Sequence, residues 1–159
     1  MPNVDHSLAA NYQKNGFVAG LEVLTNTELK ATRHRMQEIA DGVGLVFPAS
    51  GIELEPQANG IRSQSTVRKI NQCAEHDELF MAIASSDRIL DTVARLIGPD
   101  IKLFDSQCFL KPPGGIEKPY HQDSAYFTIE PRNLVTCWIA LDDVTLENGC
   151  LWVIPRSHH

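Results

Sequence analysis

The sequence predicts a single α+β domain in which helices come first and an antiparallel sheet or barrel follows. Apolar residues recur at helical spacing before residue 100, and short apolar runs separated by turn residues follow it. The 159 residues are enough for one domain with a core of its own. We therefore treat 1–159 as one domain, with a mainly helical part over 1–100 and a strand-forming part over 101–159.

Three helices are predicted in the first part. Thr25 to Glu28 has the form of a capping box, and Gly42 suits the left-handed end of the helix that follows. A second helix is expected over 78–84. The third is expected to start after Ser85 or Ser86 and to end at Gly98. The apolar stripes of the first and third helices are Leu29, Thr32, Met36 and Ile39, and Ile89, Leu90, Val93, Leu96 and Ile97.

The second part contains three predicted strands, at 101–110, 134–141 and 150–154. Pro112-Pro113-Gly114-Gly115 breaks the first, and Glu147-Asn148-Gly149 makes a turn before the last. Before them, 42–65 shows no regular pattern. Because long structureless loops in compact domains are often functional, we expect this loop to be a substrate-facing lid.

Composition excludes several classes of protein. The net charge of −6 argues against binding nucleic acid through its phosphates. No apolar run approaches the roughly 18 residues of a membrane span, and the polar start has no signal-peptide pattern. The four cysteines are scattered, which favours buried free thiols in a reducing compartment. A cytoplasmic protein with no nucleic-acid or membrane partner is expected.

The central chemical feature is His121-Gln122-Asp123. On a strand, residues two apart point to the same face, so this imidazole and this carboxylate would lie side by side. Together they are two of the three ligands that hold non-haem Fe(II) on one face. Taken alone the triplet is a weak signal, because a surface hydrogen bond would produce the same pattern.

Three further residues are candidate ligand contacts. Trp138 is flanked on its predicted strand face by the small Thr136 and Ala140, which leaves room for a ligand, although a buried tryptophan with a satisfied N–H fits equally well. Lys69 suits an anionic ligand, but it also reads as a surface charge. Gln107 is unremarkable by itself.

A set of segments, in order along nearly the full chain, resembles the phytanoyl-CoA dioxygenase family of Fe(II)- and 2-oxoglutarate-dependent oxygenases. Tyr120-His121-Gln122-Asp123 and the run 109–115 resemble the metal-binding segment of that family. Further matching segments are 12–17, 68–70, 77–80, 126–127, 130–131, 137–143 and 147–158.

The resemblance implies an incomplete double-stranded β-helix (jelly roll or cupin-like) with N-terminal helices. It implies that His121 and Asp123 bind Fe(II), and that Lys69, Gln107 and Trp138 contact 2-oxoglutarate. Dioxygen would then serve to hydroxylate a C–H bond of a small organic or acyl substrate. Related halogenases lack the carboxylate at the position of Asp123, so its presence favours hydroxylation.

The sequence departs from the family pattern at its end. The family places a distal histidine ligand, and an arginine that grips 2-oxoglutarate, beyond the last residue here, His159. We therefore expect the chain alone to be inactive and poorly folded or aggregating. His158 and His159 match a different family motif, and His6, His34 and His76 are expected to face solvent.

Two other interpretations stay open at this point. One is a non-catalytic metal-binding or interaction domain of the same fold. The other is an unrelated α+β binding domain in which the His-x-Asp triplet is accidental.

Overall fold

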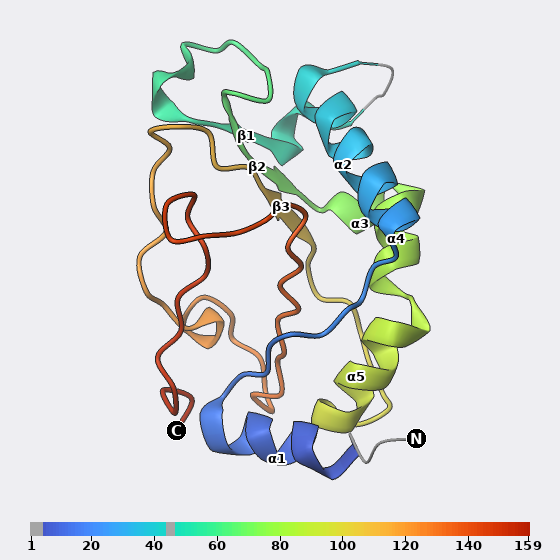
Figure 1. Ribbon diagram of the computed structural model, residues 1–159. Helices are drawn as coiled ribbons and strands as arrows, with labels where there is room; N and C mark the ends of the chain where they lie inside the picture. Colours follow the sequence, from blue (N-terminus) through green and yellow to red (C-terminus); the bar gives the residue numbers. More distant parts are fainter. Residues whose placement is uncertain (1–4, 44–46) are drawn as a thin grey trace.

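The computed structural model describes residues 5–43 and 47–159 (Figure 1). The predicted absence of a signal peptide falls partly on residues 1–4, and the predicted lid includes residues 44–46, all of which lie outside the described residues. The helices are α1 (Asp5–Asn15), α2 (Asn26–Asp41), α3 (Cys73–His76), α4 (Glu78–Ala84) and α5 (Asp87–Ile97). The strands are β1 (Ile52–Leu54), β2 (Val67–Asn71) and β3 (Gln107–Phe109), and the 3₁₀ turns are η1 (Ala49–Gly51), η2 (Pro56–Ala58) and η3 (Asp123–Ala125).

Helix α2 begins and ends as predicted. The Thr25 hydroxyl accepts a hydrogen bond from the Glu28 N–H at 3.2 Å, and the Glu28 carboxylate accepts one from the Thr25 N–H at 2.7 Å. The bond from the Thr25 N–H, and next to it one that the Thr25 hydroxyl donates to the same carboxylate, lower the pKa of Glu28. At the other end Gly42 is left-handed, with φ 71°. The capping box and the glycine cap are confirmed.

Helices α4 and α5 also match the prediction. Asp77 caps α4, because its carboxylate accepts a hydrogen bond from the Leu79 N–H at 3.0 Å. Ser86 stands at the start of α5, but its hydroxyl makes no cap and is buried without a hydrogen-bond partner. Ile89 and Val93, from the predicted stripe, are buried.

The three strands form one antiparallel sheet in the order β1-β2-β3. Its register pairs Ile52 with Ile70 and Ile70 with Cys108, and these three side chains share the core face. The opposite face is mostly polar and carries Glu53, Lys69, Asn71, Gln107 and Phe109. The sheet therefore has an apolar side and a side suited to polar ligands.

Helices α2, α3 and α4 close the apolar side (Figure 1). The cluster joins α2 (Ile39, Ala40), β2 (Val67, Ile70), α3 (Cys73, Ala74) and α4 (Phe80), together with Phe47. Burying a large apolar side chain contributes about 1.5–3 kcal/mol to the free energy of unfolding. This cluster is therefore the main source of stability.

The second part of the chain differs from its prediction. Of the strand expected at 101–110 only β3 forms, and the described residues 134–141 and 150–154 contain no strand. An extended segment becomes a strand only when a neighbouring backbone pairs with it, and here the described residues supply no partner. The helices and the small antiparallel sheet agree with an α+β fold, while the jelly roll stays a prediction.

The expected loop over 42–65 is also partly structured. It contains η1, β1 and η2, and β1 pairs with β2 along its length. Glu55 and Ala58 are buried. The three residues of β1 thus form an edge of the sheet, which differs from the free loop that was expected.

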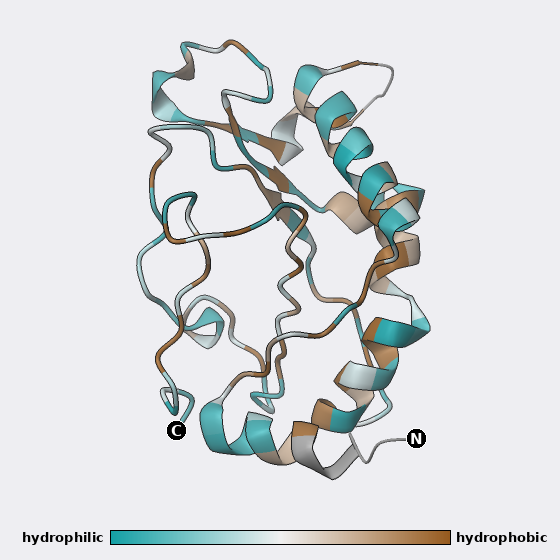
Figure 2. Ribbon diagram, in the orientation of Figure 1, coloured by the Kyte–Doolittle hydropathy of each residue, from teal (hydrophilic) through white to brown (hydrophobic). Residues whose placement is uncertain are grey.

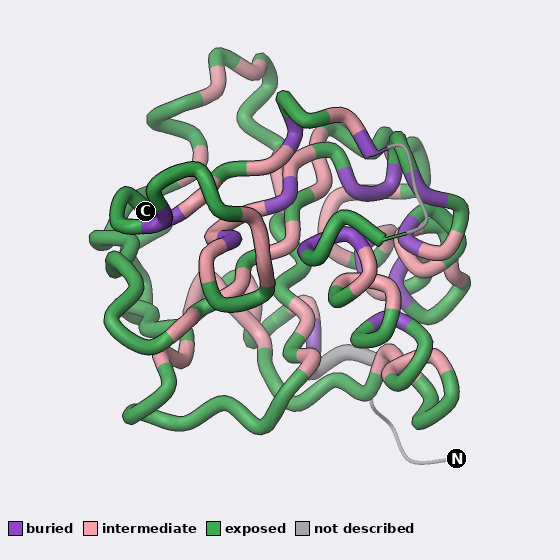
Figure 3. The backbone as a smooth tube through the Cα atoms, turned by 90° about the horizontal axis from the view of Figure 1, so that it is seen from above, coloured by how far each residue is buried: buried purple, intermediate pink, exposed green. Residues whose placement is uncertain are grey.

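Buried residues are confined to the first part of the chain (Figure 3). Every buried hydrophobic residue of the described chain lies at or before Val93, and no residue of 101–159 is buried. Figure 2 shows apolar residues along the exposed coil of this second part. Among the described residues, no helix has the length and apolar character needed to cross a membrane.

Candidate metal centre

His121 and Asp123 converge in the structure. The imidazole Nε2 lies 3.4 Å from the carboxylate Oδ1, and both side chains are about two-thirds buried, at 30% and 37% exposure. They are not on a strand as predicted. Gln122 is extended, and Asp123 begins η3, where the Tyr126 N–H closes the turn on the Asp123 carbonyl at 2.9 Å. One extended residue between them is enough to set the two side chains on the same side.

The second nitrogen of His121 fixes the tautomer. Nδ1 lies 2.8 Å from the Pro119 carbonyl oxygen, which can only accept, so Nδ1 must carry the proton. In a neutral imidazole Nε2 then carries the lone pair, 3.4 Å from Asp123 Oδ1. The His121 and Tyr126 rings pack in a T-shaped arrangement, with centroids 5.5 Å apart.

The second oxygen of Asp123 is also held. The Thr136 hydroxyl donates a hydrogen bond of 2.5 Å to Oδ2 and leaves Oδ1 to face His121. Pro119 and Thr136 were not predicted as site residues. Thr136 had been noted only as a small neighbour of Trp138, and its role follows from a contact between distant segments that single-sequence spacing does not reveal.

Lys69 and Gln107 lie together on the polar face of the sheet. The register pairs Lys69 with Phe109 and Asn71 with Gln107, so Lys69 and Gln107 are diagonal neighbours on adjacent strands. The Lys69 ammonium is 3.7 Å from Glu53 and 5.6 Å from the centre of the Phe109 ring. The Gln107 amide donates to the Asp105 carboxylate.

Trp138 has a half-exposed side chain, at 48%. It follows Thr136 by two residues, so its segment is tied to Asp123 through the Thr136 hydroxyl. Within 5–43 and 47–159, no hydrogen bond or ion pair joins this group to Lys69 or Gln107. The structure therefore places the five predicted residues in two groups: the metal motif with the Trp138 segment, and the sheet pair.

Among the described residues, no third candidate ligand accompanies His121 and Asp123. The described residues contain no group of three or more histidine, cysteine, aspartate or glutamate side chains that would hold a metal. His158 bonds to the Gln13 carbonyl at 2.9 Å, and the His159 ring stacks on it at 4.0 Å between centroids. His34 and His76 are exposed, as predicted, and the side chain of His6 lies outside the described part.

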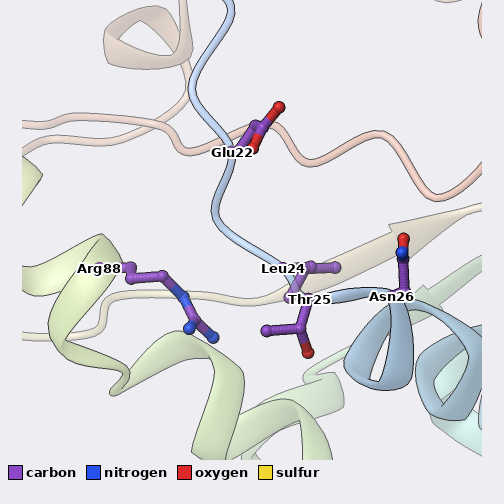
Figure 4. A pocket seen from close by; sticks show the side chains of 5 residues that line it. All are labelled: Glu22, Leu24, Thr25, Asn26 and Arg88. Carbon is purple, nitrogen blue, oxygen red and sulfur yellow. The ribbon is translucent and has the colours of Figure 1, made fainter.

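Two cavities lie away from this centre. One, of about 300 Å³, is lined by residues of the α2 start and by Arg88 (Figure 4). Arg88 there donates to the Val23 carbonyl and to the Glu28 carboxylate, so its charge already serves to join α5 to α2. The other, of about 510 Å³, lies along α3 and α4. Neither includes a predicted site residue.

All four cysteines are free, as expected, although only Cys73 is buried. The Cys73 thiol donates to the Ile70 carbonyl at 3.2 Å, and its sulfur lies 3.3 Å from that of Cys108. The contact with Cys73, and next to it burial, raise the pKa of Cys108 well above its ordinary value. These thiols lie in the core and take no part in the candidate centre.

Comparison with known proteins agrees with the motif. The family model described as phytanoyl-CoA dioxygenase (PhyH) matches residues 12–159. Peroxisomal phytanoyl-CoA dioxygenase of Bos taurus is 27% identical over 158 residues, and that of Mus musculus is 30% identical over 156. Each alignment covers 92% of this chain and 45% of the relative. A probable phytanoyl-CoA dioxygenase of Caenorhabditis elegans is 29% identical, over 92% of this chain and 50% of the relative.

The chain thus spans about half the length of the curated relatives it matches. The family model nevertheless covers nearly all of its residues, including both members of the His-x-Asp pair. On this match, the chain belongs to the phytanoyl-CoA dioxygenase family.

Proposed function

We propose that this chain carries the iron-binding segment of an Fe(II)- and 2-oxoglutarate-dependent dioxygenase that hydroxylates a C–H bond of a small organic or acyl substrate. The observation that carries the proposal is the convergence of His121 Nε2 and Asp123 Oδ1 at 3.4 Å. Fe(II), with 2-oxoglutarate as cosubstrate, would supply the activation of dioxygen that such a reaction requires.

The donor atoms fit a divalent cation. Two donors at right angles on one ion, each about 2.1 Å from it, lie about 3 Å apart, close to the separation seen here. A neutral Nε2 lone pair and a carboxylate oxygen repel each other unless a positive charge lies between them. The bonds from His121 to Pro119 and from Thr136 to Asp123 are of the kind that orients metal ligands.

We assign Lys69 and Gln107 to 2-oxoglutarate, with Trp138 at the edge of the same site. An ammonium group binds a carboxylate as a point charge, and Glu53 is a loose partner that an incoming carboxylate can replace. The polar sheet face suits a charged cosubstrate, because its opposite face alone packs into the core.

Asp123 favours hydroxylation over halogenation, because the carboxylate occupies the position that a halide would need. An acyl substrate is supported by the relatives, which are named for phytanoyl-CoA. Two of them are also named peroxisomal, and the cytoplasmic location of this chain stays a prediction.

The test is calorimetric titration of Mn(II), as an inert substitute for Fe(II), into the full-length protein that contains these residues. We expect His121→Ala to abolish binding, whereas His34→Ala, on the exposed face of α2, leaves it unchanged. A protonated His121 would neutralise Asp123 without any metal. Equal Mn(II) binding by the wild type and His121→Ala, or none by either, would therefore contradict the proposal.

A non-catalytic metal-binding domain is the second candidate, favoured by the presence of only two donors among the described residues. Addition of 2-oxoglutarate separates the two. For the oxygenase, 2-oxoglutarate binds in the presence of Mn(II), and Lys69→Ala weakens that binding. For a plain metal domain it has no effect. With only two donors gathered, we expect the chain alone to form no succinate with Fe(II).

A further inference from the structure

The end of α1 is bonded to the last residues of the chain. The final carbonyls of a helix have no partner inside it. Here the Gly16 N–H donates to the Tyr12 carbonyl at 2.7 Å. The His158 ring is bonded to the Gln13 carbonyl at 2.9 Å, and the Arg156 N–H donates to the Asn15 carbonyl at 2.8 Å. Because a carbonyl can only accept, His158 Nε2 is the donor. Residues 154–158 therefore cap this helix from the far end of the sequence.

Gly16 makes this approach possible. Its φ of +83° is left-handed, and a Cβ built on it would collide with His158 Nδ1 and lie 2.8 Å from the ring carbon Cγ. Gly20 is left-handed as well, with φ +79°, but a Cβ there would meet nothing within 4 Å. The two glycines thus share a left-handed backbone conformation, but of the two only Gly16 lies against another side chain.

The same turn reaches the metal motif through Gln122. Its side chain extends opposite to those of His121 and Asp123, because adjacent residues of extended backbone point to opposite sides. The Gln122 amide donates to the Ser157 carbonyl, and the Ser157 N–H closes the turn on Ile154 at 3.2 Å. The turn therefore binds the Gln122 side chain on one side of the backbone, while His121 and Asp123 face the candidate metal centre on the other.

We propose that Gln122, the turn 154–158 and the end of α1 form a clamp that positions the His-x-Asp pair, with Gln122 and His158 as positioning residues. The inference rests on the proposed metal site. Since coupling between two sites is reciprocal, metal bound at His121 and Asp123 must also tighten the clamp.

The first experiment measures Mn(II) affinity in the full chain. Outer partners of metal ligands typically change affinity 10- to 100-fold, so we expect Gln122→Met to weaken binding about tenfold. His158→Ala should weaken it by a similar factor, and the double variant by no more than Gln122→Met, since both break one chain of contacts. Gln57→Met, at an exposed position, is the matched control.

The second experiment is hydrogen exchange followed by mass spectrometry, with and without Mn(II). In the wild type, Mn(II) should slow exchange in 13–16 and 154–158. In Gln122→Met that effect should disappear while residual binding persists, a result that a purely structural role does not produce. Without metal, Gly16→Ala should speed exchange in 154–158 several-fold, and Gly20→Ala should not.

The outcomes separate the two proposals. If His121→Ala abolishes binding while Gln122→Met and His158→Ala bind as the wild type does, the clamp is wrong and the metal site stands. If neither the wild type nor any variant binds Mn(II), the proposed function fails. The exchange rates measured without metal then still test whether the turn 154–158 is bonded to the end of α1. Equal exchange in Gly16→Ala and Gly20→Ala would overturn the clamp.

Discussion

Residues 5–100 and 101–159 are held by different forces. The first part contains all five α-helices and two of the three strands of the described residues, and apolar side chains from α2, β2, α3 and α4 bury one another. The second contains one strand of three residues and no buried residue. Several large apolar side chains are exposed there, among them Phe104, Tyr126, Trp138, Leu146 and Trp152.

The difference teaches where the chemistry resides. In the second part, polar bonds fix the site: His121 to Pro119, two residues before it, Asp123 to Thr136, and Gln122 to Ser157. Such bonds set direction more than stability, because each contributes only about 1 kcal/mol net. Changes in the first part should therefore alter folding, and changes in the second should alter ligand binding.

The largest contrast is expected in thiol reactivity. Cys73, buried in the first part, reacts only when the core opens, while Cys150 in the second part is half-buried. At about pH 8 we expect iodoacetamide to modify Cys73 at least about a hundredfold more slowly than Cys150. Cys108 should also react slowly until the pH rises well above the ordinary cysteine value, because its raised pKa keeps the thiol protonated. Mass spectrometry of timed samples gives the modification rates. Equal rates for Cys73 and Cys150 would contradict the expected difference between the two parts of the chain.

Core truncation is expected to have the next largest effect. Ile70→Ala, at a fully buried position, should lower the free energy of unfolding by about 2–5 kcal/mol. Ile154→Ala, at a position 57% exposed, should change it by less than about 0.5 kcal/mol. Urea unfolding followed by circular dichroism measures both. A large loss in Ile154→Ala would show that the second part contributes a core after all.

An intermediate effect is expected at Thr136. Thr136→Val removes the hydroxyl that holds Asp123 Oδ2 and should weaken Mn(II) binding about tenfold, with unchanged unfolding. Thr136→Ser keeps a hydroxyl and should restore most of the affinity. Thr128→Val, at an exposed site, serves as the control in the same titration. If Thr136→Ser binds Mn(II) as weakly as Thr136→Val does, the hydrogen bond to Asp123 is not the cause of the loss.

The smallest effect is expected at the cap of α2. Thr25→Ala should destabilise the chain by about 1 kcal/mol and leave Mn(II) affinity unaltered. Thr25 lowers the pKa of Glu28 in the folded state, so this contribution is present at neutral pH and is lost as the pH falls through that lowered value, below the ordinary 4.5. Unfolding experiments at several pH values should show the gap between wild type and Thr25→Ala closing in acid, and a constant gap would contradict the assigned bonds.

The sequence predicted most where the signal is local. Capping of α2 by Thr25 and Gly42, and the stripe of α5, depend on neighbours within a few residues, and all three were predicted correctly. Convergence of His121 and Asp123 was also predicted, although on the wrong backbone, since one extended residue suffices where a full strand had been expected.

Long-range contacts were beyond the sequence. The predicted strands at 134–141 and 150–154 have suitable residues, but pairing decides whether an extended segment becomes a strand. The support of Asp123 by Thr136 joins segments 13 residues apart, and that of Gln122 by Ser157 joins segments 35 apart. Neither spacing carries a periodic signal, so single-sequence reasoning had nothing from which to predict them.

The irregular register of β2 has a consequence for how this family segment tolerates change. Leu54 pairs with Val67 and Glu53 with Lys69, so Arg68 is an extra residue that lets Val67 and Ile70 both face the helices. Removing that one residue would restore strict alternation and leave Val67 and Ile70 two positions apart, still on the same face. Deletion of Arg68 would thus spare both the core and the pairing of Lys69 with Glu53, so this strand tolerates loss of its extra residue.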